Sequence, residues 1–173
     1  MANTARHTVI LRTLIFVLRG DEVLLIRYQS GDGDTAGEKS ERVGIHNGIG
    51  GHVEAGEDIL ASATREAMEE AGVKLEAPRI AGVMHIDGFA GKQILNFVVV
   101  ASTHDEPISE CDEGALDWVN IDHLDKLHTF SDLKPLLRHS LASESIFTGT
   151  ARFDGFNLLE MRIDGRPVAL DGD

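Results

Sequence analysis

The apolar positions of the chain fall into short runs that polar, glycine-rich segments separate. Residues 7–18 and 22–28 are rich in aliphatic and β-branched side chains, and the polar tripeptide at 19–21 lies between them. Such runs favour strands, and a glycine-containing break favours a turn. The pattern therefore predicts a β-hairpin. The polar, glycine-rich stretch 29–45 that follows predicts a long loop, and loops of that length in compact domains are usually functional or mobile.

Residues 58–71 predict a helix, because they contain good helix formers and neither Gly nor Pro. Ile59 and Ala63 begin an apolar repeat at helical spacing, and Gly72 stands where a helix commonly ends. Directly before this helix, residues 46–56 carry four glycines. We expect them to form a short strand that enters a tight turn.

The second half of the chain also consists of short apolar runs separated by polar, turn-forming residues. Strands are predicted for residues 79–87, 93–102, 114–121, 146–153 and 156–163, with a turn at 88–92 and a hairpin turn at Asp154-Gly155. A short helical turn is expected at 122–127. A second helix is expected at 132–143, with Ser131 as its N-cap. Strands outnumber helices and no regular βαβ alternation appears, so we expect one α+β domain over residues 1–173.

The charge of the chain is concentrated in two windows. The 173 residues include 16 basic and 29 acidic side chains, for a formal net charge of −13. Residues 51–73 hold six acids and one base, and residues 105–125 hold eight acids and no base. A nucleic-acid-binding module needs a basic face, so no nucleic-acid partner is expected. A small phosphorylated ligand remains compatible, because carboxylates can hold the cation that holds a phosphate.

Cysteine content and hydropathy exclude several classes of protein. Cys111 is the only cysteine, which excludes an internal disulfide and a multi-cysteine zinc site. No stretch reaches about 18 uninterrupted apolar residues, so no membrane association is expected. The sequence predicts a cytoplasmic protein that is a monomer or a homodimer.

Three carboxylates cluster on the predicted helix over 58–71. Glu66, Glu69 and Glu70 are spaced to share one helix face, and Arg65 is the only base nearby. Clustered carboxylates on rigid backbone suit hard divalent cations. The alternative is a solvated acidic helix face. The glycines that precede the helix favour a site, because they allow close approach of a ligand or an ion.

The segment from Gly51 to Val73 resembles the Nudix box, G-x5-E-x7-R-E-U-x-E-E-x-G-U, where U is a bulky aliphatic residue. All seven fixed positions match, and Ala67 is a smaller residue at the first U position. The strand order on both sides, about residues 8–163, also resembles the Nudix fold, an α-β-α sandwich with a mixed β-sheet between helices. The family hydrolyses nucleoside diphosphates linked to another moiety.

The resemblance implies a set of roles. Mg²⁺, or Mn²⁺, would be the cofactor, and a metal-activated water would attack a phosphorus atom. Glu66, Glu69 and Glu70 would be metal ligands, or one of them would activate water, and a backbone carbonyl at Gly50 or Gly51 would complete the site. Glu57 and Arg65 would form an orienting ion pair.

A general base is expected on the downstream acidic loop. Glu113 is the candidate, and Glu110 and Asp112 are the alternatives. The competing interpretation is an acidic loop without a catalytic part.

The rest of the chain resembles the MutT-type 8-oxo-dGTP diphosphatases within this family. HNGIGGHVE, DEGALDWVNIDHL and FTGTARFDGFNLLEMRI carry the resemblance. Asn47 matches an asparagine that reads the purine, although it could also be a turn residue. His46 replaces the usual tryptophan, and Asp132 stands alone where an acidic pair is usual; it could instead favour a helix N-terminus. Gly50 and Arg27 are further candidates for substrate contact, with a solvated strand-end charge as the alternative for Arg27.

The resemblance thus predicts a metal-dependent pyrophosphohydrolase of nucleoside triphosphates, with oxidised purine nucleotides as the expected substrates. The alternatives are a Nudix hydrolase of nucleotide sugars or RNA 5′ ends, and a non-catalytic nucleotide-binding domain.

Overall fold

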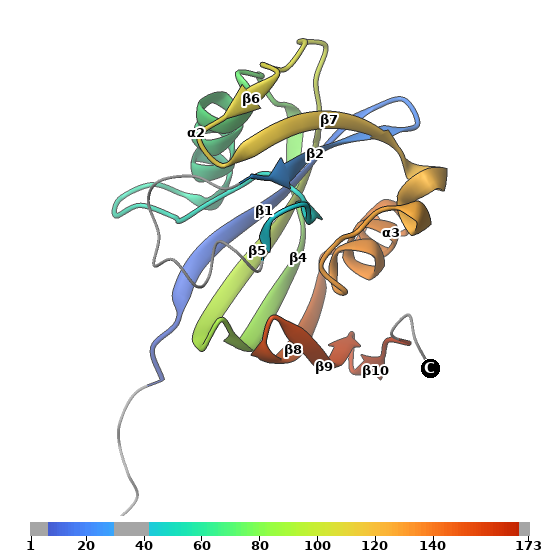
Figure 1. The fold of residues 1–173 in the computed structure, drawn as a ribbon. Coiled ribbons are helices and arrows are strands. Elements are labelled where there is room, and N and C mark those ends of the chain that lie inside the picture. Colours follow the sequence, from blue (N-terminus) through green and yellow to red (C-terminus); the bar gives the residue numbers. More distant parts are fainter. Residues whose placement is uncertain (1–6, 30–41, 170–173) are drawn as a thin grey trace, which may run out of the picture.

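The computed structural model describes residues 7–29 and 42–169, and its strands belong to one mixed sheet (Figure 1). The strands are β1 (Ile10–Arg19), β2 (Glu22–Tyr28), β3 (His46–Asn47), β4 (Glu76–Phe89), β5 (Lys92–Ser102), β6 (Glu110–Cys111), β7 (Gly114–Asn120), β8 (Phe147–Gly155), β9 (Asn157–Ile163) and β10 (Arg166–Pro167). Their order is β10-β9-β8-β4-β5-β1-β2-β7-β6, and β3 pairs with β2. The pairs β1–β5 and β4–β8 are parallel, and the other pairs are antiparallel.

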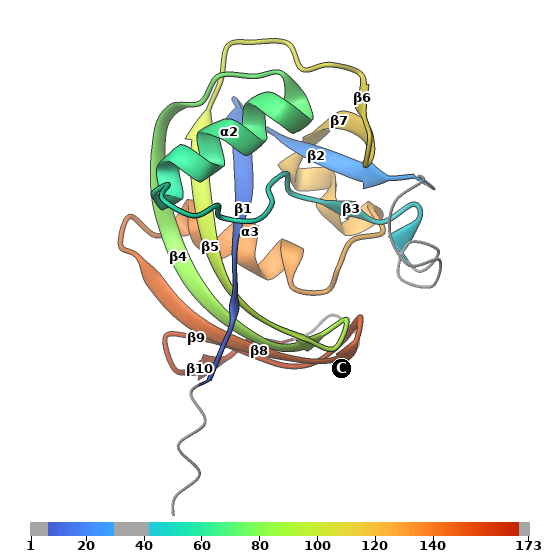
Figure 2. The ribbon, with the colours of Figure 1, turned by 90° about the vertical axis from the view of Figure 1, so that its left-hand side faces the viewer.

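Helices cover both faces of this sheet, so the expected α-β-α arrangement with a mixed β-sheet is confirmed (Figure 2). Helix α2 (Ile59–Ala71) buries Ala63, Ala67 and Ala71 against one face. Helix α3 (Leu133–Ala142) lies on the other face, where the 3-10 helix η1 (Ile121–Lys126) precedes it. None of the helices in the described part of the chain is long and apolar enough to span a membrane.

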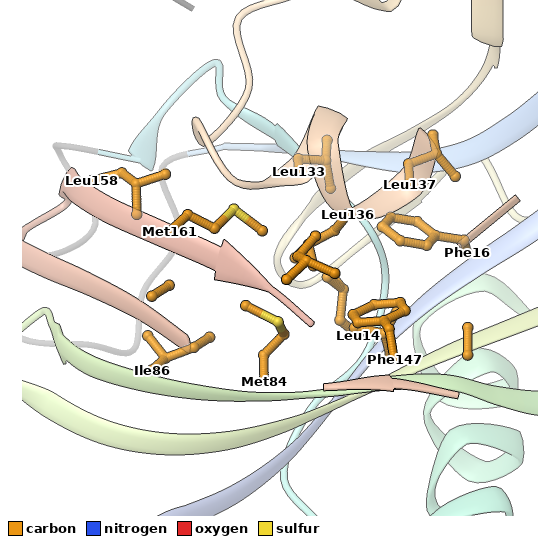
Figure 3. Close-up of a cluster of buried hydrophobic side chains, with 14 of the residues drawn as sticks. Leu14, Phe16, Met84, Ile86, Leu133, Leu136, Leu137, Phe147, Leu158 and Met161 are labelled. Carbon is orange, nitrogen blue, oxygen red and sulfur yellow. The ribbon is translucent and has the colours of Figure 1, made fainter. Parts of the chain in front are cut away.

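The core beneath α3 is the larger of two apolar clusters. Figure 3 shows Leu133, Leu136 and Leu137 of α3 in one cluster with Met84 of β4 and Met161 of β9, and Leu137 lies beside Phe16 of β1. All six side chains are almost completely buried. Burial of this kind contributes about 1.5–3 kcal/mol for each large apolar side chain. The cluster therefore fixes α3, and with it the residue that precedes the helix, against the sheet.

Helix α2 begins and ends where the sequence predicts. The Asp58 carboxylate accepts hydrogen bonds from the amides of Leu60 and Ala61, both at 2.9 Å. Gly72 adopts the left-handed conformation with φ of 68° and ends the helix. The caps satisfy backbone groups that a helix end leaves free.

The glycine-rich segment before α2 lies along β1 in the position that a neighbouring strand would take. β1 and β2 pair only near their turn, at Val17–Arg19 with Glu22–Leu24. Below that point the amide of Thr13 donates to the Gly51 carbonyl at 2.9 Å, and the amide of Ile15 donates to the Ile49 carbonyl at 2.8 Å. The segment thus enters the sheet between two diverging strands and is held close to α2.

Several boundaries differ from the prediction. β4 begins at Glu76 and continues through Gly88 to Phe89, because a bulge lets the strand pass the predicted turn. The N-cap of α3 is Asp132, not Ser131, and its side chain makes no capping hydrogen bond. Two dipeptide strands, β6 and β10, were not predicted, because two residues carry no periodicity. Most of the predicted loop 29–45 lies outside the described residues.

Candidate active site

The glycines at the end of the glycine-rich segment bring its backbone against α2. A Cβ atom on Gly51 would lie 2.4 Å from a carboxylate oxygen of Glu66, and one on Gly50 would lie 2.4 Å from the Thr13 carbonyl. Gly50 also has a φ of 129°, which L-residues with side chains rarely adopt. Its amide donates to the Glu70 carboxylate at 2.8 Å. A side chain at Gly50 would therefore clash with the backbone of β1, and one at Gly51 would displace the Glu66 carboxylate.

Arg65 organises the other carboxylates of α2. Its guanidinium donates to Glu57 at 2.8 Å and to Glu66 and Glu69 at 2.9 Å each. It also donates to the backbone carbonyl of His52 at 2.9 Å, which ties the glycine-rich segment to the helix. The hydrogen bonds from Arg65 and from the Glu54 amide lower the pKa of Glu57 to about 2. The contacts with Glu57, Glu66 and Glu69 raise the pKa of Arg65. The predicted contact between Glu57 and Arg65 is present.

Glu70 has a different environment. Burial is the main cause that raises its pKa to about 8, and the negative charges of Glu113 and Glu66 raise it further. The hydrogen bond from the Gly50 amide opposes this shift. Burial also raises the pKa of Glu66, although its hydrogen bond with Arg65 opposes the shift. Burial therefore disfavours the charged form of both carboxylates.

The carboxylates of α2 face the acidic loop across a shallow cleft, which we call the acidic cleft. Its lining comprises Glu66, Glu69, Glu70, Ile108, Glu110, Cys111, Asp112 and Glu113. The two acidic windows of the sequence therefore meet in space. All three residues considered as general base lie in this lining. Among them, Glu113 is the one whose negative charge raises the pKa of Glu70.

The chemistry of the acidic cleft fits a hard divalent cation, which prefers carboxylate oxygens. Within residues 7–29 and 42–169, no three Asp, Glu, His or Cys side chains converge into a group that could hold a metal ion. Arg65 engages Glu66 and Glu69, while the Gly50 amide engages Glu70. The predicted ligand set is thus gathered in one cleft without being preassembled. The raised pKa of Glu70 among other carboxylates is what a bound cation would relieve.

A second cavity, which we call the aromatic cavity, lies on the other side of the glycine-rich segment. Its lining comprises Arg12, Thr13, Leu14, Tyr28, Arg42, Asn47, Gly48, Gly50, Ile86, Phe89, Ile94, Asn96, Phe130 and Asp132. The rings of Phe89 and Phe130 meet edge to face with centroids 5.3 Å apart, and Tyr28 lies 6.4 Å from Phe130. Apolar walls with a few polar groups are typical of small-molecule sites.

Three polar side chains inside the aromatic cavity can read a ligand. Asn47 donates to the Tyr28 hydroxyl at 3.3 Å, and its carbonyl oxygen accepts from the Gly48 amide at 3.0 Å, so it shapes the turn and lines the cavity at once. Burial raises the pKa of Asp132 to about 6. The Asn96 carbonyl oxygen is buried and has no hydrogen-bond partner among the described residues.

Two of the predicted site residues have other partners. Arg27 pairs with Asp117 at 3.5 Å and lines neither cavity. The Gly51 carbonyl already accepts the hydrogen bond from Thr13, although the Gly51 backbone does contact Glu66. Arg12 and Arg42 both line the aromatic cavity and were not among the predicted site residues. Arg12 could have been suspected from the sequence, because it is a charged residue within an apolar strand. Nothing in the sequence distinguishes Arg42 from the other polar residues of its segment.

Comparison with known proteins identifies the family. The model of the NUDIX domain matches residues 10–139, which is most of the chain. The chain belongs to the Nudix family. Its resemblance to the Nudix box is thus confirmed at the level of the whole domain, and the described mixed sheet with its helices is a Nudix fold.

The relatives of this Nudix hydrolase include proteins of the predicted subgroup. It is 28% identical over 125 residues to the Nudix hydrolase YvcI of Bacillus subtilis, covering 69% of this chain and 79% of YvcI. It is 26% identical over 156 residues to the oxidized purine nucleoside triphosphate hydrolase of Danio rerio, covering 89% and 94% of the two chains. Among solved structures, a MutT protein from Bacillus halodurans superposes with a TM-score of 0.78 at 28% identity, covering 92% and 100%.

Proposed function

We propose that this Nudix hydrolase is a divalent-metal-dependent pyrophosphohydrolase of nucleoside triphosphates, and that oxidised purine nucleotides of the 8-oxo-dGTP kind are its substrates. The products would be a nucleoside monophosphate and pyrophosphate. Similarity to the oxidized purine nucleoside triphosphate hydrolases of Mus musculus and Danio rerio supports the choice of substrate.

One observation carries the proposal. Gly50 lines the aromatic cavity, and its amide binds Glu70, which lines the acidic cleft. The two cavities are therefore separated by little more than one turn of backbone. A planar base held between aromatic walls would leave its phosphate chain to cross this turn toward the carboxylates. The molecule thus offers an apolar site for the base and a cation-binding site for the phosphates, at adjoining positions.

The carboxylates of the site would have two different roles, cation binding and positioning of the backbone. Glu66, Glu69 and Glu70 would hold the cation, together with the Gly50 carbonyl, since the Gly51 carbonyl accepts the Thr13 hydrogen bond. A divalent cation there would lower the pKa of the attacking water and neutralise charge on the phosphate oxygens. Arg65 and Glu57 would hold the glycine-rich segment in place against α2. Because Arg65 now bonds Glu66 and Glu69, these two side chains would reorient when the cation binds.

Proton transfer is assigned to the acidic loop. We favour Glu113 as the general base, because its charge acts on Glu70 across the cleft. It would take a proton from the attacking water as the new P–O bond forms and the P–O bond to the pyrophosphate leaving group breaks. Glu110 and Asp112 line the same cleft and are the residues to exchange next.

Base recognition is assigned to Asn47 and Asp132, with the Asn96 carbonyl oxygen as a further acceptor. The Asn96 oxygen has no partner among the described residues, and a buried acceptor without a partner costs about 1–3 kcal/mol. A ligand N–H would relieve that cost. Oxidation of guanine at C8 converts N7 from an acceptor into an N–H donor, so a cavity lined by acceptor groups is suited to distinguish the two bases.

The decisive experiment is a substrate panel. The protein with Mg²⁺ is incubated with ordinary and 8-oxo purine triphosphates, a nucleotide sugar and a 5′-triphosphate RNA, and pyrophosphate and phosphate are measured separately. We expect pyrophosphate release that is fastest with 8-oxo-dGTP, and no release after the metal is chelated.

The panel separates the parts of the proposal. Equal rates with dGTP and 8-oxo-dGTP would remove the assignment to oxidised bases and leave the chemistry. Preferred turnover of the nucleotide sugar or the RNA end would replace the substrate class. Absence of turnover throughout would reduce the chain to a nucleotide-binding Nudix domain.

A further inference from the structure

Arg42 contacts residues of both cavities, although it lines only the aromatic one. It lines the aromatic cavity, where its guanidinium carbon lies 3.9 Å from the centre of the Tyr28 ring. The same guanidinium lies 3.7 Å from the carboxylate of Glu113, which lines the acidic cleft. Gln29 ties the backbone of Glu113 to the end of β2 through a hydrogen bond of 3.0 Å. Arg42 therefore spans the passage between the proposed base site and the proposed catalytic base.

The two contacts of Arg42 differ in strength. The Tyr28 ring is buried and fixed by its neighbours, so stacking on it positions the guanidinium. The pair with Glu113 is looser: 3.7 Å exceeds ordinary hydrogen-bond length, and the Glu113 side chain is 51% exposed. Exposed ion pairs of this kind contribute little to stability. The contact with Tyr28 can thus persist while the contact with Glu113 is exchanged.

A phosphate chain is the partner that the remaining face of Arg42 suits. A guanidinium presents several N–H donors in one plane and binds phosphate oxygens in pairs. Arg27 is already paired with Asp117 and lines neither cavity, so it does not offer an equivalent cation. Arg12 also lines the aromatic cavity, from β1, and its charge lowers the pKa of Glu66 and Glu70, whereas Arg42 contacts Glu113 itself.

We propose that Arg42 binds the phosphate chain of the substrate and that this contact draws it away from Glu113, leaving the Glu113 carboxylate free to serve the reaction. The inference rests on the proposed function for the identity of the substrate, but the phosphate contact itself does not require a nucleotide. Substrate bound in the aromatic cavity would then decide, through Arg42, whether the Glu113 carboxylate in the acidic cleft is paired or free. Without substrate, Glu113 stays engaged with Arg42.

Binding of inorganic pyrophosphate tests the contact without using activity. Isothermal titration in a fixed excess of Mg²⁺ compares the wild type with Arg42→Gln, Arg42→Lys and the control Arg138→Gln, which removes an exposed ion pair with Asp125. We expect Arg42→Gln to weaken binding roughly ten- to hundredfold, since a hydrogen bond between charged groups is lost. Arg42→Lys should weaken it less, and Arg138→Gln should leave it unchanged.

The release of Glu113 is tested by a double-mutant cycle. Glu113→Gln should tighten pyrophosphate binding where Arg42 is present, because the competing partner is gone. It should have no such effect in the Arg42→Gln background. Circular dichroism and thermal unfolding of each variant establish that the fold is retained.

Two results would overturn the inference. One is wild-type affinity in Arg42→Gln, or no pyrophosphate binding by the wild type. The other is an equal change in pyrophosphate affinity on Glu113→Gln with and without Arg42. That result would show that pyrophosphate and Glu113 do not compete for Arg42. Failure of the nucleotide panel would instead reject the proposed function and leave these binding results standing, so the two failures are distinguishable.

Discussion

The backbone amide of Gly50 donates a hydrogen bond of 2.8 Å to the carboxylate of Glu70, which lies 20 residues further along the chain. This contact joins the glycine-rich segment to the last turn of α2 and places one carboxylate against a backbone turn. A buried carboxylate that accepts one amide hydrogen bond and faces two other carboxylates is poorly stabilised by the protein alone. The relationship therefore defines the point at which a cation and a phosphate chain would be received.

Glu70→Gln should lower turnover of the preferred triphosphate by about a hundredfold or more, a loss typical of removing a group that acts in the chemical step. The amide oxygen of glutamine can still accept from Gly50, so the fold should be retained. Steady-state pyrophosphate release and circular dichroism measure the two effects. Glu160→Gln, an exposed position on β9, is the control. A near wild-type rate for Glu70→Gln would show that the metal and base roles belong to other carboxylates.

Arg65→Lys should lower the free energy of unfolding by about 1–3 kcal/mol, because an ammonium cannot reproduce the planar set of contacts with Glu57, Glu66 and Glu69. Denaturation by urea measures the change. Arg138→Lys at the exposed pair with Asp125 should change stability by less than about 0.5 kcal/mol. Equal effects of the two substitutions would mean that the network on α2 is no stronger than a surface ion pair.

Gly51→Ala should reduce both stability and Mg²⁺ affinity, since its Cβ would lie 2.4 Å from the Glu66 carboxylate and must displace it. The backbone at Gly51 does not have a positive φ, so the substitution reports on the contact rather than on strain. Overpacking of this kind costs about 1–3 kcal/mol. The shorter side chain of Glu66→Asp in the same variant should recover part of the stability. If the stability losses of the two substitutions simply add in the double variant, the effect of Gly51→Ala does not come from its contact with Glu66.

The half-buried carboxyl of Asp132 should make stability depend on pH. Its pKa is raised from 3.8 to about 6, so the folded protein holds a proton that the unfolded chain releases between these values. The contribution of Asp132 to the free energy of unfolding is therefore most favourable below about pH 4 and falls as pH rises through 6. Asp132→Asn should flatten the profile of unfolding free energy between pH 4 and 7, by about 1–2 kcal/mol given that the residue is partly exposed. Parallel profiles for the two proteins would contradict this assignment.

Much of the fold could be predicted from local pattern. The hairpin of β1 and β2, helix α2 with its Gly72 stop, and the hairpin of β8 and β9 all follow from periodicity and turn residues. The failures, in contrast, arise from contacts between distant segments. The bulge that carries β4 past Gly88 and the choice of Asp132 as N-cap depend on neighbours from other elements, which no window of sequence contains.

The site divides in the same way. The sequence by itself determined the carboxylates of α2, their partner Arg65 and the glycines before them, because these residues lie within one helix and one turn, where spacing fixes which side chains meet. It also marked the acidic loop through its charge. Only the tertiary structure decided that this loop faces α2, that Arg27 pairs with Asp117 and that Arg42 stacks on Tyr28. The physical reason is that these contacts join segments whose separation along the chain carries no periodicity, so packing of the sheet and α3 sets them.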